Sequence, residues 1–447
     1  MSGKIAVDFG TSNTLIAAWD DSRRDARPIL IPDYSLPLAV GSTSIPLVPS
    51  LIHYTADNRQ WVGAQVLERG LYQSERTFRW MKRYISNRTP SRVTLDGMER
   101  TPLTAAADYL NAVLVFARQE IASPDEEVAF SVPVETFEHY ENWLSEVAER
   151  SGLRRFRLID EPSAAALGYE AHIQPGSVYL VFDFGGGTMH ASVILIESEE
   201  SASSGRRCRV LGKAGRDIGG STLDQWLYQE SLSRARLSAH DPQVRQASTS
   251  LLVACEQVKE KLSFEAACAA NLALADGRQF EMEWSRGQFE DLMERNGLFL
   301  EINRTLRAAI NQAREKGYDE DSIQAVLVVG GSAMVPAVQR LLRQNFGAGK
   351  VLVDRPLDAV VRGAAAFVAG VDFYDHIQHD YAIRYLDPAS GDYRYRALVS
   401  RGTPYPTREA VARLAVKASF DGQTDLGLAI FEMAAQHKAE SQPYELV

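Results

Sequence analysis

The chain has 447 residues, of which 45% are hydrophobic and 24% charged, and its formal net charge is −10 at pH 7. This length and composition suit two or three globular domains with ample cores. The acidic balance, without a basic stripe, argues against a nucleic-acid partner, and no run of 18 apolar residues indicates a membrane span.

The three cysteines, Cys208, Cys255 and Cys268, form no Cys-x-x-Cys pair. This usage fits reduced thiols rather than a disulfide framework or a zinc site. The N-terminal residues lead directly into an apolar run, without the h-region and cleavage site of a secretory signal. These features predict a cytoplasmic protein.

The first third of the chain predicts strands and helices in alternation. A hairpin comes first, with a strand from Ile5 to Phe9, a turn over Gly10, Thr11, Ser12 and Asn13, and a return strand. Gln73 to Tyr84 has a helical pattern. A long amphipathic helix is expected from Leu103 to Ile121, because Pro102 suits a first helical position.

The following segment continues the alternation. Strands are expected at Val128–Val132 and Phe156–Ile159, with a helix from Thr136 to Ser151 between them. Asp160 to Tyr169 then reads as a helix rich in alanine, whose small side chains permit close packing. Glu161 stands at its entrance.

A second hairpin repeats the design of the first. The apolar run Val178–Phe182 ends in Asp183, and Gly185, Gly186, Gly187 and Thr188 precede a second apolar run at Ala191–Ile196. Consecutive glycines bring backbone N–H groups up to an anion, and the neighbouring carboxylate can hold magnesium or its waters. A plain Gly-rich hairpin is the alternative for either turn alone. Two Asp-Phe-Gly turns about 175 residues apart instead predict two related lobes facing one polyphosphate.

The second half of the chain predicts further strand–Gly–helix units. Gly219 and Gly220 open a helix, where an anion is favoured. Glu256, Lys259 and Ser263 lie on one face of a helical segment from Ser233 to Phe264, where a surface Glu–Lys pair is the plainer interpretation. The remaining expected elements are helices at Phe289–Lys316, Val335–Asn345 and Ala359–Ala369, and a strand at Ala325–Val329 that meets Gly330, Gly331 and Ser332.

The composition changes after Gly370. We expect an α/β nucleotide-binding domain at 1–370 with two lobes, a linker at 371–378, and a small all-β module with a polar tail at 379–447. Strands of this module are expected at Tyr393–Val399, Arg413–Lys417 and Leu426–Glu432.

Five motifs in order resemble the DnaK-type heat-shock chaperones, a branch of the actin-like ATPase superfamily whose lobes share a duplicated ribonuclease-H-like fold. They are Asp8–Asn13, Asp160–Tyr169, Asp183–Thr188, Gly330–Ser332 and Arg362–Ala366. Each motif alone is weak, and the ordered set is specific. The resemblance covers about residues 4–370 well and the rest weakly.

The resemblance implies a slowly hydrolysing ATPase that binds ATP or ADP with Mg²⁺. Asp8 and Asp183 would hold the magnesium waters. Lys82 would face the γ-phosphate and Glu161 the attacking water, with Thr188 in the catalytic set, as phosphoryl transfer to water requires. The phosphates would contact Gly10–Asn13 and Gly185–Thr188, and the remaining nucleotide positions would be Gly220, Glu256, Lys259, Ser263, Gly330, Gly331 and Ser332.

The chain also departs from the family pattern. His190 stands where the family has an aspartate that helps to hold potassium, and a neutral imidazole is a poor alkali-ion ligand, so a potassium requirement is in doubt. Glu260 and Met334 replace the two arginines that clamp adenine. Leu357 replaces the aspartate of a Pro-Asp-Glu motif.

The tail departs further. Val371 to Tyr374 replaces the leucine linker, and Val399 to Thr407 resembles the start of the peptide-binding β-sandwich, which then stops about halfway, without a lid. The chain is therefore most similar to the truncated, YegD-like branch. We expect an unfolded or specific client protein as partner. Dependence on a J-domain co-chaperone stays open, and we expect such a partner to stimulate ATP turnover little.

Three alternatives remain for the function. An actin-like filament protein shares the nucleotide site but lacks the tail and the Lys82 context. A sugar-kinase relative would need a carboxylate base beside a substrate pocket. A scaffold could use nucleotide as a structural ligand with little hydrolysis.

Overall fold

The computed structural model describes residues 3–40, 43–86, 89–121, 127–133, 138–153, 155–169, 177–196, 209–274, 276–370, 375–376, 380–387, 390–400, 403–405, 410–414, 423 and 428–433. The chain divides into two compact units, residues 1–196 with 211–371 and residues 197–210 with 372–447. The linker expected at 371–378 falls largely outside the described residues, as does Cys208, so the domain boundaries stay a prediction.

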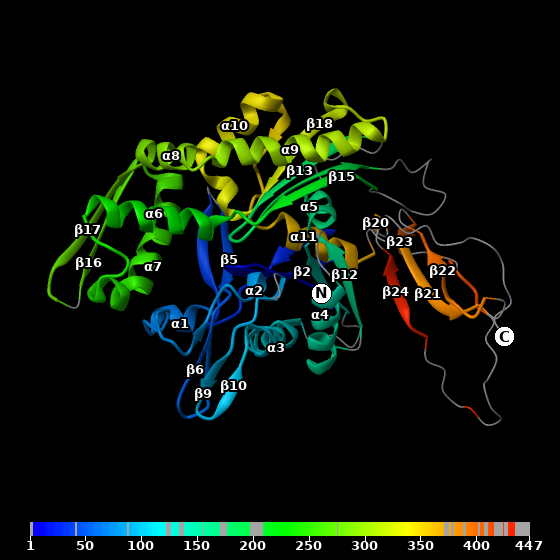
Figure 1. Cartoon of the computed structure of the whole chain (residues 1–447), viewed down its shortest axis with the longest axis horizontal. Helices are drawn as coiled ribbons and strands as arrows, with labels where there is room; N and C mark the ends of the chain where they lie inside the picture. The colour runs from blue at the N-terminus through cyan, green and yellow to red at the C-terminus, as the bar shows by residue number, and fades with distance from the viewer. Residues whose placement is uncertain are drawn as a thin grey trace. The chain divides into compact units, whose positions relative to one another are not determined.

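The first unit contains two large sheets, each the centre of one lobe (Figure 1). The sheet of lobe I has seven strands, and in it β1 pairs with β2 antiparallel and with β11 parallel. The N-terminal hairpin predicted from the sequence is therefore confirmed. The strand order of this sheet is β12 (Phe156–Asp160), β11 (Glu127–Val132), β1 (Lys4–Phe9), β2 (Asn13–Asp20), β5 (Thr43–Pro49) and β4 (Leu36–Val40), with β3 (Asp25–Pro28) beside β2.

The sheet of lobe II has five strands around the second hairpin. Strands β13 and β14 pair antiparallel, and β13 also pairs parallel with β18. Both lobes thus place a hairpin next to a parallel strand, as the repeated Asp-Phe-Gly turns predict. The order is β15 (Arg209–Arg216), β14 (Met189–Leu195), β13 (Val178–Phe184), β18 (Ile323–Val329) and β19 (Val351–Leu352).

Each lobe has its own apolar core. In lobe I the buried ring of Phe9 lies 6.0 Å from that of Tyr109 on α3 (Pro102–Ile121) and 6.3 Å from that of Trp143 on α4 (Glu138–Arg150). In lobe II buried residues of the sheet pack with those of α6 (Gly220–Arg234), α7 (Pro242–Phe264), α8 (Arg286–Arg295), α9 (Leu298–Glu315), α10 (Pro336–Phe346) and the β16 (Ala267–Ala273)–β17 (Gln279–Ser285) hairpin.

Two alanine-rich helices cross between the sheets, α5 (Glu161–Gly168) and α11 (Ala359–Val368). Their backbones nearly touch: a Cβ built on Gly363 would lie 1.7 Å from the Ala164 carbonyl oxygen, and one on Gly168 would lie 1.9 Å from the Ala359 oxygen. Helix α11 packs against β1, β2, β3 and β11, and α5 contacts β13 and β18. The pair therefore joins the two lobes, and the small residues expected at α5 serve this crossing.

For three helices expected from the sequence, the predicted boundaries are wrong. Gln73–Tyr84 contains strand β8 (Thr77–Phe78) and α2 (Met81–Ser86), with Trp80 at φ 54° between them. Phe289–Lys316 breaks at Gly297, which has φ 76°. Ser233–Phe264 is interrupted between α6 and α7, because Asp241 and Pro242 start a new helix.

Shorter elements complete the first unit. They are β6 (Ile52–Tyr54), β7 (Gln60–Val62), α1 (Ala64–Glu68), β9 (Val93–Leu95), β10 (Met98–Arg100), and 3₁₀ turns at Glu320–Ser322, Gly331–Met334 and Ala348–Lys350. Strands β7, β6 and β8 form a small sheet, and β9 pairs with β10.

The described part of the second unit is all-β. Strand β21 (Asp380–Leu386) pairs with β22 (Tyr393–Val399) and β24 (Ile430–Met433), and β20 (Asp375–His376) pairs with β23 (Pro404–Tyr405). The expected strand at 393–399 is confirmed, and the 426–432 expectation is met only in part by β24. Of the strand expected at 413–417, residues 413 and 414 form no strand, and residues 415–417 lie outside the described residues. The rings of Tyr395 and Phe431 meet edge to face at 5.5 Å across this sheet.

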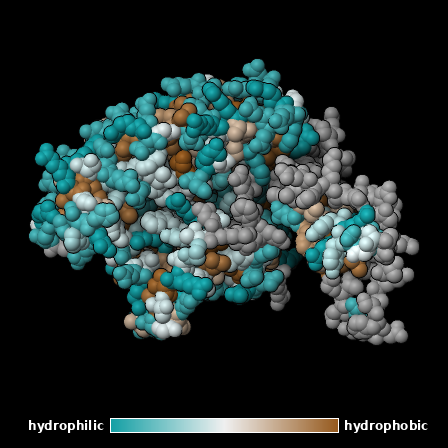
Figure 2. All heavy atoms as spheres, in the orientation of Figure 1, coloured by the Kyte–Doolittle hydropathy of each residue, from teal (hydrophilic) through white to brown (hydrophobic). Residues whose placement is uncertain are grey.

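The face of the molecule drawn in Figure 2 is mostly hydrophilic over the described residues, with hydrophobic residues scattered among them. Among those same residues, none of the helices combines the length and apolar character needed to cross a membrane.

The crossing of α5 and α11 predicts a strong effect of one added methyl group. Gly363→Ala should lower the free energy of unfolding by about 3 kcal/mol or more, because the backbones must move apart. The matched control is Gly287→Ala on α8, where no atom lies within 4 Å of the new Cβ, and which should be neutral or stabilising by about 0.5–1 kcal/mol. Urea unfolding measures both. Equal midpoints for the two variants would contradict the close crossing.

Candidate nucleotide site in the cleft between the lobes

The two glycine-rich turns face each other directly. A Cβ on Gly186 would lie 2.5 Å from the Ser12 hydroxyl oxygen, and one on Gly187 would lie 3.0 Å from that of Thr11. Only glycine allows this approach, so hydroxyl and amide groups from both lobes line one narrow gap. The Gly185 N–H donates to the Thr188 carbonyl at 3.0 Å, which closes the second turn.

Three carboxylates and one ammonium meet beside these turns. Lys82 Nζ donates to Glu161 Oε1 at 2.5 Å, and both side chains are buried. Asp8 accepts a 2.6 Å hydrogen bond from the Ser131 hydroxyl. Burial and the charges of Glu161 and Asp8 raise the pKa of Asp183 to about 8, although Lys82 opposes the shift. Burial likewise raises the pKa of Asp8. The site therefore holds more negative charge than it can neutralise alone.

Local structure explains the position of Glu161. Asp160 caps helix α5 by accepting a 2.9 Å hydrogen bond from the Ser163 N–H, and Pro162 fits the first turn, where no intrahelical donor is needed. Glu161 is the first residue of the helix, where the macrodipole favours a carboxylate. The cap thus directs this side chain toward Lys82 on α2.

A second polar cluster lies on helix α7. Lys259 Nζ lies 2.9 Å from Asp224 Oδ1 and 3.0 Å from Oδ2. Burial and the neighbouring Glu256 and Glu260 raise the pKa of Asp224 to about 7, with Lys259 opposing. Burial and Glu256 raise the pKa of Glu260 as well. This end of the site is acidic around one buried ammonium.

Glycines connect this cluster to the phosphate turns. The Gly220 N–H donates to the Gly185 carbonyl at 3.0 Å, and the Ser332 hydroxyl donates to the same oxygen at 2.8 Å. A Cβ on Gly220 would lie 2.9 Å from both Lys259 Nζ and the Ser332 hydroxyl. Gly330 has φ 90°, and a Cβ there would lie 2.4 Å from the Phe184 carbonyl oxygen.

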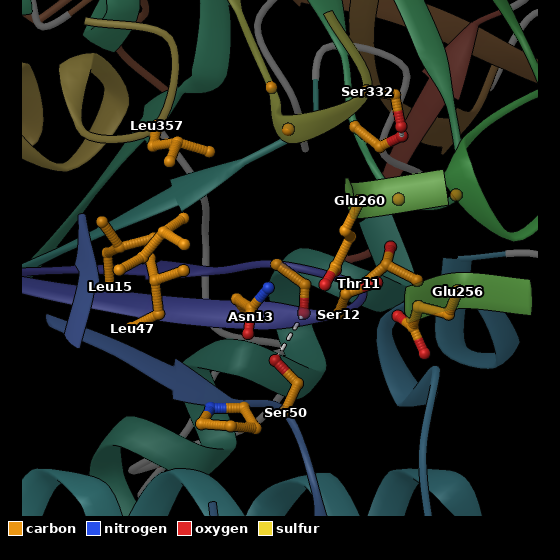
Figure 3. Close-up of a pocket in the computed structure, with 18 of the residues that line it drawn as sticks. Thr11, Ser12, Asn13, Leu15, Leu47, Ser50, Glu256, Glu260, Ser332 and Leu357 are labelled. Atoms are coloured by element: carbon orange, nitrogen blue, oxygen red, sulfur yellow. Dashed lines mark hydrogen bonds between the residues drawn. The ribbon is translucent and has the colours of Figure 1, made fainter. Parts of the chain in front are cut away.

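One cavity of about 590 Å³ contains nearly all the residues that the sequence nominated (Figure 3). Gly220 lies behind its wall, as described above. The nominated residues that line the cavity are Asp8, Gly10, Thr11, Ser12, Asn13, Lys82, Glu161, Asp183, Gly185, Gly186, Gly187, Thr188, Glu256, Lys259, Ser263, Gly330, Gly331 and Ser332. Their roles stay a prediction, while their convergence is a fact of the fold.

The cavity also contains residues that sequence reasoning missed. Figure 3 shows an apolar end where Leu15, Leu47 and Leu357 gather, opposite the end with Glu256 and Glu260. The β4–β5 hairpin brings Leu47 there, and its alternating apolar residues were a visible signal. Tyr72, whose hydroxyl donates to Glu256 Oε2 at 3.0 Å, had no such signal.

The departures from the family pattern fall at separate places. Glu260, Met334 and Leu357 line the cavity. His190 lies opposite Asp183 in the register of the β13–β14 hairpin. An imidazole thus stands next to the charged centre, where the family pattern has a carboxylate.

The charged centre fits a divalent cation beside a polyphosphate. With Asp8, Glu161 and Asp183 ionised and Lys82 protonated, its formal charge is −2, and carboxylate oxygens are the ligands that Mg²⁺ prefers. The opposed glycine turns line the same gap, and successive backbone N–H groups in such turns can bind an anion.

Comparison with known proteins agrees with this arrangement. The family model described as "Hsp70 protein" matches residues 92–434. A chaperone protein HscA homolog of Polynucleobacter necessarius subsp. necessarius (strain STIR1) is 27% identical over 96% of this chain and 68% of its own length. The HscA homolog of Haemophilus influenzae (strain 86-028NP) is 25% identical over 96% and 67%, and that of Bordetella petrii 28% over 82% and 58%.

The family match covers more than half of the chain, and it includes the two glycine motifs of lobe II, Gly185–Thr188 and Gly330–Ser332. The two-lobed architecture and the resemblance drawn from the five motifs point the same way. The chain belongs to the Hsp70 family of chaperone-type ATPases with the actin-like fold.

Proposed function

We propose that this protein binds ATP with Mg²⁺ between its two lobes, hydrolyses it slowly, and uses the cycle to control a client protein. The observation that carries the proposal is the pair of opposed glycine turns with the buried Lys82–Glu161 pair beside them. Sites for phosphoryl transfer need an anion cradle, a cation and a group that orients the attacking water. The glycine turns, Lys82 and Glu161 are the candidates for these three parts.

The side chains of the centre would divide these tasks. Asp8 and Asp183 would hold Mg²⁺, which when bound screens the phosphate charge. Lys82 would move its ammonium from Glu161 to the γ-phosphate, and the released carboxylate would accept a hydrogen bond from the attacking water. Thr188 would position the terminal phosphate from the turn of lobe II.

The end of the cavity that would hold the base would bind ATP and ADP differently from the corresponding site of the relatives. Ser263, Lys259 and Glu256 would contact the nucleoside, while Glu260 and Met334 offer no cation to stack on adenine. A scaffold that binds nucleotide with little hydrolysis is therefore the second candidate, and the acidic, buried Glu260 is the observation that favours it.

The remaining proposals concern context. The relatives are named chaperone proteins, and we propose that the described β unit of this chain contacts an unfolded or specific client. Membership of the YegD-like branch and the cytoplasmic location expected from the cysteines stay predictions.

The deciding experiment is calorimetric titration of the full chain with ATP and ADP in Mg²⁺, first in sodium and then in potassium buffer. Micromolar binding together with single-turnover hydrolysis supports the ATPase proposal, and binding without hydrolysis supports the scaffold. Lys82→Met should lower the hydrolysis rate at least about 100-fold with little change in nucleotide affinity. An unchanged rate contradicts the assigned role.

The charge at the centre predicts opposite stability effects for two substitutions. Asp183→Asn should raise the free energy of unfolding of the metal-free protein by about 1 kcal/mol or more, because a carboxyl with a raised pKa destabilises the fold when ionised. Lys82→Met should lower it by about 3–5 kcal/mol, because it leaves Glu161 buried and unpaired. Urea unfolding in EDTA at pH 8.5 measures both, with exposed Asp21→Asn as a neutral control. Equal signs would contradict this charge arrangement.

Arg157 stands where the resemblance places the family's coupling arginine, and its contacts predict a weak response to a J-domain co-chaperone. Its guanidinium lies 3.9 Å from the ring centroid of Phe367, and Nη1 donates to the Phe367 carbonyl at 3.3 Å. Because these contacts hold the arginine within its own unit, a J-domain protein should stimulate ATP turnover less than tenfold. Steady-state phosphate release with and without the co-chaperone measures this ratio, and a rise of tenfold or more contradicts the prediction.

A further inference from the structure

We propose that Glu161, Asp183 and His190 form a binding site for one divalent transition-metal ion of the Co²⁺–Zn²⁺ class. The site goes beyond the proposed ATPase activity and does not require nucleotide to be bound. It uses direct protein ligands, two carboxylate oxygens and one imidazole nitrogen.

The geometry brings three ligand atoms together. One oxygen of Glu161, one of Asp183 and one ring nitrogen of His190 all lie within 4.8 Å of one another. Metal–ligand bonds of about 2.0–2.2 Å separate ligand atoms by about 3.0–4.4 Å. Shifts of well under 1 Å, within the reach of side-chain rotation, therefore complete the site.

Regular backbone structure fixes the positions of these three residues relative to one another. Asp183 and His190 are opposed in the antiparallel register of β13 and β14, which puts their Cβ atoms about 4.5–5.5 Å apart on one face. Glu161 is buried and comes from the capped first turn of α5. Two ligands thus belong to a lobe II hairpin and the third to the helix that crosses toward lobe I.

Charge and ligand chemistry select the ion. The centre has a formal charge of −2 when its carboxylates are ionised and Lys82, which donates to Glu161 Oε1, is protonated. A divalent ion meets that charge. An imidazole nitrogen binds later divalent ions such as Co²⁺ and Zn²⁺ far better than it binds Mg²⁺ or alkali ions. His190 therefore converts an oxygen-only environment into one that distinguishes between divalent ions.

The test uses the nucleotide-free full chain and CoCl₂ as probe. Isothermal titration gives stoichiometry and affinity in 5 mM Mg²⁺, and visible absorption reports nitrogen coordination. The wild type should bind one Co²⁺ with a d–d band that Mg²⁺ does not displace. Three variants are compared, namely His190→Ala, His190→Asp, which restores an oxygen ligand, and the exposed His240→Ala as control.

Loss of a direct ligand should cost more than the about 10–100-fold that loss of an outer-shell partner costs. His190→Ala should therefore weaken Co²⁺ at least tenfold and abolish the band. His190→Asp should retain some Co²⁺ binding that 5 mM Mg²⁺ now displaces, and His240→Ala should match the wild type. Melting temperatures in EDTA verify that all variants fold.

The proposal is overturned if His190→Ala binds Co²⁺ as the wild type does, or if His240→Ala loses the band. It is also overturned if no Co²⁺ binds in the presence of Mg²⁺. Because no nucleotide is added, these outcomes do not depend on ATP binding. A protein that fails to bind ATP yet passes this test would refute the proposed function and keep the metal site.

Discussion

The crossing of α5 and α11 is the contact on which the rest of the first unit depends. Carbonyl oxygens of one helix occupy the space that side chains of the other would need, at Gly168 and Gly363. Each helix also packs on strands, α11 on the sheet of lobe I and α5 on β13 and β18 of lobe II. A single rigid joint therefore holds the two sheets at a spacing that lets their hairpin turns meet.

The same joint places chemistry at its end. Glu161 begins α5, so the helix that sets the spacing also delivers a carboxylate to the charged centre. Such a centre is unfavourable for folding, because burial and like charges raise the pKa values of Asp8 and Asp183. Cations that enter the cleft relieve this cost, which is the usual relation between a strained site and its ligand.

Sequence reasoning predicted the elements whose signal is local. The Asp-Phe-Gly turns, the glycine pair at the start of α6 and the alanine-rich helices needed no long-range information. The helix expected over Gln73–Tyr84 failed because Thr77 and Phe78 join β6 as an edge strand, and tertiary pairing overrides local propensity there. Gly297 ends one helix and starts another, a left-handed position that the apolar periodicity on both sides conceals.

The site shows the same division between local and distant information. Residues of the motifs converge in the cavity, and the resemblance to a known family identified them. Tyr72 belongs to no motif, so only the fold brings it into the cavity. The sequence shows that His190 replaces an aspartate of the family pattern. Its position opposite Asp183 follows from counting residues along the hairpin, so the sequence also indicates which carboxylate the imidazole neighbours.

The hydrogen bond from Tyr72 to Glu256 joins residues 184 positions apart, and both line the cavity. Gln73 accepts another bond from Ser250 on the same helix α7. A bond to a charged acceptor is worth about 1.5–3 kcal/mol, roughly a ten- to hundredfold change in an equilibrium. Separation of these walls must break it, so the residence time of a ligand inside the cavity is set partly by the strength of this hydrogen bond.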